Sequence, residues 1–116
     1  MKRDASVFLQ HILESIARIE EFTEGMSKED FVASVKTQDA VIRRLEIIGE
    51  ASKNLPNSFR EKHPEIEWGD MIRTRDKLSH GYFGVDLKLA WDILKNDLPA
   101  LKEKIGKILG EMRKDE

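Results

Sequence analysis

Cysteine is absent from the 116-residue sequence, which excludes disulfide bonds, thiolate nucleophiles and cysteine-ligated zinc or iron–sulfur clusters. No apolar run approaches the roughly 20 residues that a membrane-spanning helix needs, so no membrane segment is expected. The N-terminal residues 1–4 lead into an amphipathic pattern, which does not fit a secretory signal. The sequence therefore predicts a cytoplasmic protein.

Motifs for metals and cofactors are also missing. There is no glycine-rich phosphate loop, no dinucleotide fingerprint and no His-Glu-x-x-His. The di-iron pattern Glu-x-x-His does not occur before any of the three histidines. Glu46 and Glu50 lie one helical turn apart and could contribute to an acidic site, but a structural pair explains them more simply. No metal site and no cofactor is predicted.

The length predicts one domain over residues 1–116 with a modest hydrophobic core. Charged residues make up 36% of the chain and the formal net charge is −2, which argues against binding nucleic acid over the whole surface. A local basic site remains compatible with this balance.

Strong helix formers dominate, and strictly alternating apolar patterns are absent, so we expect an all-α protein. Helices are predicted at about 5–24, 28–35, 38–54, 57–63, 68–80, 87–96 and 99 onward, the last two being one kinked helix or two. The expected caps are Asp4, Ser27 with Asp30 as a capping box, Thr37, Asp86 and Asp97, and Gly25 and Gly81 are expected to end helices. The prediction is an antiparallel helical bundle of about five to seven helices.

The apolar side chains recur at spacings of three and four, which places them on one face of each helix. The predicted core comprises Leu9, Ile12, Ile16, Ile19, Val41, Leu45, Ile48, Ala51, Leu55 and the coiled-coil-like series Leu94, Leu98, Leu101, Ile105, Ile108 and Met112.

Positive charge is concentrated in residues 71–83, within an otherwise acidic chain. Arg73, Arg75 and Lys77 stand against Asp76, so this segment carries +2 and the remaining residues carry −4. Such a patch can hold a phosphate. Asp76 lies four residues before His80, close enough on a helix to orient the imidazole and favour its protonated form.

Helical geometry restricts how this segment can form a site. Arg75 and His80 are five residues apart, about 140° around an ideal helix, whereas Arg73 and His80 nearly share a face. A site with Arg75 needs a side chain that reaches round, a distorted helix end or a second subunit. A charged helix that simply ends in His80 and Gly81 is the alternative interpretation.

The spacing Arg75-x4-His80-Gly81-Tyr82 fits the Arg-x4-His-x-Tyr motif of HepT-like toxins. The sequence thereby resembles this family of small helical proteins, which belongs to the HEPN superfamily. The resemblance extends over nearly the whole chain. Residues 38–51 resemble the family's central helix, residues 63–68 its approach to the motif helix, and residues 80–86 and 91–93 its exit.

The resemblance implies a HEPN-type bundle that forms a homodimer, with the two motifs facing one cleft. It implies a metal-independent endoribonuclease, the toxin of a type VII-like toxin–antitoxin pair, with RNA as its substrate. The implied partner is an MNT-type nucleotidyltransferase antitoxin, which silences the toxin by adding AMP to the motif tyrosine, here Tyr82.

The implied roles agree with the chemistry of the side chains. His80 would be the general acid or base while the RNA 2′-hydroxyl attacks, and Arg75 would stabilise the charge that grows on the phosphorane. Tyr82 would stack on a base or bind phosphate. Arg73, Lys77 and Ser79 are further candidates for substrate binding, although an exposed helical serine explains Ser79 equally well.

One position departs from the family pattern, because Asp76 stands where the family often has asparagine. A carboxylate can orient Arg75 or His80, but it also adds negative charge where RNA phosphate must bind. This departure motivates a second hypothesis, a non-catalytic module that binds a nucleotide or docks a partner. A purely structural dimerisation bundle is the third.

Overall fold

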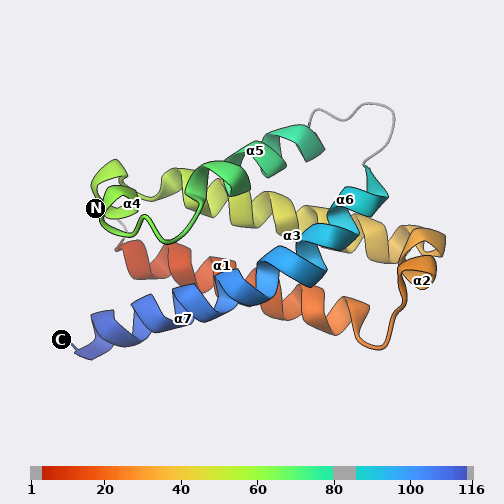
Figure 1. Ribbon diagram of the computed structural model, residues 1–116, viewed down its shortest axis with the longest axis horizontal. Coiled ribbons are helices and arrows are strands. Elements are labelled where there is room, and N and C mark those ends of the chain that lie inside the picture. Colours follow the sequence, from red (N-terminus) through yellow and green to blue (C-terminus); the bar gives the residue numbers. More distant parts are fainter. Residues whose placement is uncertain (1–3, 80–85, 115–116) are drawn as a thin grey trace.

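The computed structural model describes residues 4–79 and 86–114, without the side chains of residues 75–79. Over these residues the chain is helical and contains no strand, which confirms the predicted all-α bundle (Figure 1). The elements are α1 (Ala5–Thr23), α2 (Lys28–Ala33), α3 (Val35–Asn54), α4 (Asn57–Lys62), α5 (Trp68–Ser79), α6 (Leu87–Asp92), the π-helical segment η1 (Ile93–Asp97) and α7 (Leu98–Lys114).

The first two helix starts confirm the predicted caps. The Asp4 carboxylate accepts a hydrogen bond from the Ser6 backbone N–H, and Ser27 and Asp30 form a reciprocal capping box at α2. Gly25 has a φ of +74°, a left-handed conformation that favours glycine, so the chain turns there after α1.

The predicted cap Thr37 is wrong. Helix α3 begins at Val35, and the Ser34 hydroxyl oxygen accepts the Thr37 backbone N–H, so Ser34 is the cap and Thr37 lies in the first turn. Ser34 also follows the last residue of α2, so one residue ends one helix and caps the next. The connection between α2 and α3 is therefore shorter than the sequence spacing predicted.

Asp97 is also not a cap, because α6, η1 and α7 form one continuous helical run from Leu87 to Lys114. The Leu98 N–H bonds to the Ile93 carbonyl, five residues back, which widens the helix locally. Pro99 explains this widening, since proline has no N–H to donate and its ring would clash with the carbonyl four residues earlier. Of the two predicted alternatives, the single irregular helix is correct.

Four long helices make the bundle. α1 packs against α3 and α7, and α3 packs against α5, so α3 lies between α1 and α5 (Figure 1). Across the α1–α7 contact, the Lys102 ammonium lies 3.0 Å from a Glu20 carboxylate oxygen. Over the described residues, none of the helices is both long and apolar enough to cross a membrane.

The predicted core is buried, with Met112 only partly so. Among the described residues, sequence periodicity missed five further buried hydrophobic side chains because they lie in short helices or connections, or beside the predicted series: Phe31, Ile66, Trp68, Ala90 and Leu109. Among the described residues Phe31 is the largest fully buried side chain, and its ring packs against the Trp91 ring at a centroid distance of 5.5 Å and a tilt of 37°, which joins α2 to α6.

We predict that Ile105→Ala lowers the free energy of unfolding by about 2–5 kcal/mol, because its fully buried side chain would leave a cavity between α7 and α1. Urea unfolding at fixed protein concentration measures the loss. The matched control Lys107→Ala, at an exposed position on the same helix, should change it by less than about 0.5 kcal/mol. Equal losses in both variants would contradict the assigned core.

Candidate functional site

The start of α5 is fixed by contacts from two other parts of the chain. The buried Trp68 donates a hydrogen bond from its indole Nε1–H to the His63 carbonyl at 3.0 Å. From α7, the Lys104 ammonium donates to the Glu65 carbonyl at 2.8 Å. These bonds hold the connection before α5, and therefore the direction in which the helix leaves it.

Helix α5 runs antiparallel along α3. The Ser52 hydroxyl, which donates to the Ile48 carbonyl, lies 3.9 Å from the sulfur of Met71. Further along α5, Thr74 lines the same pocket as Leu45, an earlier residue of α3. The C-terminal half of α5 therefore passes the earlier turns of α3.

Most of the predicted site lies beyond the region whose side chains are described. The positions of Arg75, Asp76, Lys77 and Ser79 belong to the backbone of α5, but their side chains are outside the described set. His80 and Tyr82 lie outside the described residues altogether, as does the expected helix end at Gly81. The roles assigned to these residues therefore stay predictions.

Arg73 is the one predicted substrate-binding residue whose side chain is described. It is exposed and forms an ion pair with Asp70, one turn earlier on α5. Gly69 makes room for this conformation, because a Cβ there would lie 3.0 Å from the Arg73 guanidinium. Arg73 thus reaches back toward the start of α5 instead of along the motif.

Two carboxyl groups lie together at the start of α5. The pKa of Glu67 is raised by a hydrogen bond with Asp70 and by the negative charge of Asp70, while the charges of Lys104 and Arg73 act in the opposite direction. Neither Glu67 nor Asp70 belongs to a motif that the sequence predicted to be functional. The available signal was the spacing of three residues between two acids at a predicted helix start.

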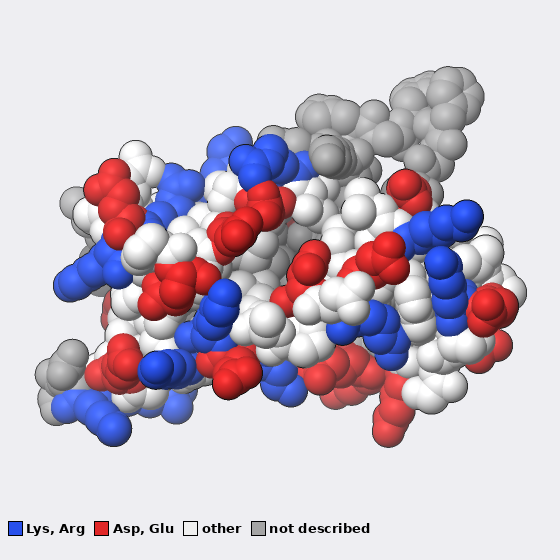
Figure 2. All heavy atoms as spheres, viewed as in Figure 1, with Lys and Arg blue, Asp and Glu red and all other residues white. Residues whose placement is uncertain are grey.

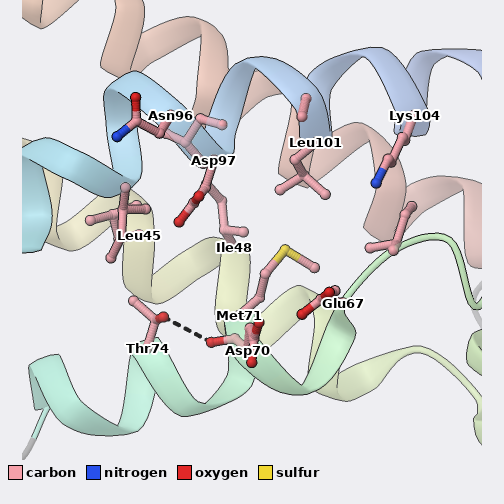
Figure 3. A pocket seen from close by; sticks show the side chains of 14 residues that line it. Leu45, Ile48, Glu67, Asp70, Met71, Thr74, Asn96, Asp97, Leu101 and Lys104 are labelled. Atoms are coloured by element: carbon pink, nitrogen blue, oxygen red, sulfur yellow. Dashed lines mark hydrogen bonds between the residues drawn. The ribbon is translucent and has the colours of Figure 1, made fainter.

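The pair borders a pocket of about 340 Å³ between α5 and the η1–α7 helix. Figure 3 shows Asp97 and Lys104 extending from the η1–α7 helix toward Met71, Asp70 and Glu67 on α5 and its start. The apolar lining comprises Leu45, Ile48, Ile66, Met71, Ile93, Leu98, Ala100 and Leu101, and the polar lining comprises Glu67, Asp70, Thr74, Asn96, Asp97 and Lys104.

The charge of this pocket does not suit RNA. It has three carboxylates and one ammonium, and that ammonium already donates to the Glu65 carbonyl. A phosphodiester would be repelled by the remaining negative charge. Acidic and basic side chains are interspersed over the surrounding face in Figure 2, so the described residues form no continuous basic surface that leads into the pocket.

The pair Glu46 and Glu50 and the histidines His11 and His63 lie on described helices or directly after one. Over the described part of the chain, no group of three or more acidic or histidine side chains could hold a metal ion. Glu46 is half-buried on α3 and Glu50 is exposed. His11 is exposed beside Phe8, and His63 follows α4 and contacts the Phe59 ring at a centroid distance of 4.6 Å.

We predict that Asp70→Asn lowers the pKa of Glu67 toward its usual range, because the substitution removes the neighbouring negative charge. An NMR titration of the Glu67 side-chain carboxyl carbon measures this change. Asp97→Asn is the matched control: it removes a carboxylate from the same pocket that does not contribute to the Glu67 shift, and it should leave the titration unchanged. An unaltered titration in Asp70→Asn would contradict the pairing.

Comparison with known proteins identifies named relatives. "Probable ribonuclease HepT" of Thermococcus cleftensis is 56% identical over 108 residues, which cover 93% of this chain and 98% of that protein. A "Putative RNase" of Methanocaldococcus jannaschii is 46% identical over 114 residues, covering 95% of this chain and 94% of the relative.

A third relative is longer. "Gamma-glutamylcyclotransferase and putative RNase" of M. jannaschii is 53% identical over 115 residues, and the match covers 99% of this chain but only 52% of that protein. The chain thus spans about half the length of this relative. No solved structure gives a significant match. The family described as "Ribonuclease HepT-like" matches residues 12–108, which include all of α5. The chain belongs to the HepT-like ribonuclease family.

Proposed function

We propose that this protein is a metal-independent endoribonuclease. The observation that carries the proposal is the spacing Arg75-x4-His80, whose first residue lies in α5, in a chain similar to proteins named "Probable ribonuclease HepT" and "Putative RNase". This segment is the basic part of an acidic chain, so it is also the part that best attracts a phosphodiester.

The proposed reaction uses the RNA 2′-hydroxyl as its internal nucleophile. As a base, imidazole removes the 2′-hydroxyl proton while the oxygen attacks phosphorus, and an acid returns a proton to the departing 5′-oxygen. His80 is the general acid or base in these proton transfers, because imidazole titrates near neutral pH. Arg75 stabilises the charge on the phosphorane, since guanidinium is planar and permanently charged. The products carry a 2′,3′-cyclic phosphate and a 5′-hydroxyl.

Neighbouring side chains have supporting roles in this proposal. Lys77, Ser79 and Tyr82 bind the RNA backbone or a base, and Asp76 orients the catalytic groups. Arg73 contributes positive charge from the preceding turn, although its guanidinium is also ion-paired with Asp70. The net charge of residues 71–83 remains +2 even with Asp76 present.

A homodimer resolves the angular separation of the two catalytic residues. Arg75 and His80 are about 140° apart on an ideal helix, so one subunit does not present both on one face. If each cleft combines Arg75 of one subunit with His80 of the other, both groups can reach the same phosphate. In this proposal the active enzyme is therefore dimeric.

The proposed biological setting is a cytoplasmic toxin–antitoxin pair. An MNT-type nucleotidyltransferase antitoxin transfers AMP from ATP to the Tyr82 hydroxyl and releases pyrophosphate. The attached phosphodiester adds bulk and negative charge beside the basic segment, so RNA phosphate is repelled. This repulsion is sufficient by itself to lower the affinity of the modified protein for RNA.

We expect the purified protein to cleave RNA in EDTA and to leave 2′,3′-cyclic phosphate ends, and His80→Ala and Arg75→Ala each to lower the rate by at least about 100-fold. Gel analysis of end-labelled RNA measures cleavage, and circular dichroism verifies that the variants remain helical.

His11→Ala is the matched control, because it removes an exposed histidine from α1 and should leave the rate unchanged. Full activity in His80→Ala would refute the proton-transfer role. Nucleotide binding by calorimetry, without any RNA turnover, would instead support the non-catalytic module that Asp76 suggests.

Incubation with a cognate nucleotidyltransferase and ATP should add the mass of AMP to the protein and abolish RNA cleavage. Intact-mass spectrometry gives a direct test, because Tyr82 is the only tyrosine in the sequence. Tyr82→Phe should acquire no AMP under the same conditions. An unchanged mass of the unmodified protein, with a partner verified as active, would contradict covalent silencing.

A further inference from the structure

Position 75 of the motif lies beside the middle of α3. The sulfur of Met71 on α5 lies 3.9 Å from the hydroxyl of Ser52 on α3, and the two helices run in opposite directions. Four residues beyond Met71, position 75 is therefore level with about residue 48 of α3. Thr74 and Leu45, which line one pocket, place it level with about residue 44 instead. The two pairs thus bracket position 75 within residues 44–48 of α3.

Glu46 is the acidic residue of α3 at this level. Residues 44–48 contain no other carboxylate, and Glu46 is half-buried. The acids on either side along α3, Asp39 and Glu50, are exposed. A carboxylate that is partly removed from water is stabilised by a cation beside it, whereas an exposed one is already stabilised by its hydration. Among these three acids, Glu46 is therefore the one suited to bind a cation on a neighbouring helix.

The turn of α3 places Glu46 on the side toward α5. Figure 1 shows α5 above α3 and α1 below it, and Leu45 lines the pocket in front of α3. In this view α3 runs from right to left, so its right-handed turn carries the chain from the front of the helix to its upper side. Glu46 follows Leu45 by about 100° around the axis. It therefore faces α5 and lies away from the pocket.

Position 75 is on the face of α5 that packs against α3. It follows Met71 by one turn and Trp68 by two turns, and residues at these spacings share one face of a helix. Met71 contacts Ser52 of α3, and Trp68 is buried. An arginine at position 75 therefore starts from the side of α5 on which α3 lies, level with Glu46.

From this juxtaposition we infer that Glu46 is a positioning residue for Arg75. Its carboxylate binds the guanidinium and fixes the direction in which that group meets the phosphate. The inference rests on the proposed function and specifies what holds its cationic group. A guanidinium has five N–H donors, so it can bind a carboxylate along one edge and a phosphate oxygen along another, and it stays charged while it does so.

The pair also keeps Arg75 from the carboxylates of the pocket. Glu67, Asp70 and Asp97 border that pocket, and each could compete for a nearby cation. Arg73 is an example, because its guanidinium is ion-paired with Asp70. Glu46 lies away from the pocket, so a guanidinium bound to it is held apart from these three groups and remains accessible to RNA.

A double-mutant cycle of Glu46→Gln and Arg75→Ala tests the pair without any reference to RNA. We expect their effects on the unfolding equilibrium constant to be coupled by about fivefold or more, because each substitution removes the same interaction. Urea unfolding at a fixed protein concentration measures the constants. The matched control is Glu50→Gln, at an exposed acid one turn along α3, and its effect should be additive with that of Arg75→Ala.

RNA cleavage tests the positioning role. Glu46→Gln should lower kcat about 10-fold and change KM by less than about twofold, because Glu46 acts through a group that stabilises the transition state. In the Arg75→Ala background the same substitution should have no further effect on kcat, which a general loss of stability would not produce. Glu50→Gln should retain the wild-type kcat.

Three results would count against the inference. Additive effects of Glu46→Gln and Arg75→Ala on unfolding would overturn it, and so would coupling of Glu46→Gln to Arg43→Ala in place of Arg75→Ala, since Arg43 lies one turn earlier on α3. A coupled pair with an unchanged kcat in Glu46→Gln would refute the positioning role. A wild type that cleaves no RNA refutes the proposed function, and the cycle then decides separately whether Glu46 and Arg75 are paired.

Discussion

The packing of α3 between α1 and α5 is the constraint on which the other features depend. Its buried side chains include Leu45 and Ile48, which face the α5 side, and Ala51 one turn further on. Over the residues that the structure describes, α5 rests on α3 without an extensive contact to α7, and the pocket lies between these two helices. The direction of α5 is then set by its start, through the Trp68 hydrogen bond and the Lys104 contact with the Glu65 carbonyl.

Helix α5 divides its charge along its length. Its start carries Glu67 and Asp70, where acidic groups are favoured by the helix dipole, and its later half carries more basic than acidic residues. The acidic start borders the pocket between α5 and the η1–α7 helix, whose negative charge repels phosphate. The basic half belongs to the segment to which we propose that RNA binds.

Much of the fold could be predicted because its signals are local. The spacing of Leu9, Ile12 and Ile16 predicts the buried face of α1, and Asp4 predicts where that helix begins. The errors arose where two local signals compete. Ser34 and Thr37 can each cap a helix, and Asp97 before Pro99 resembles a helix start, but a π-helical turn also accommodates proline in a continuous helix.

For the candidate site, the sequence by itself determined the family motif, the positive charge around it and the helix that contains Arg75, since these follow from residue order and spacing along one segment. Only the tertiary structure decided that Glu67, Asp70 and Asp97 border one pocket, and that Arg73 is paired with Asp70. Glu67 and Asp97 are thirty residues apart in the chain, and no periodicity relates them. Their proximity depends on which helices border the pocket, a consequence of packing that no single segment encodes.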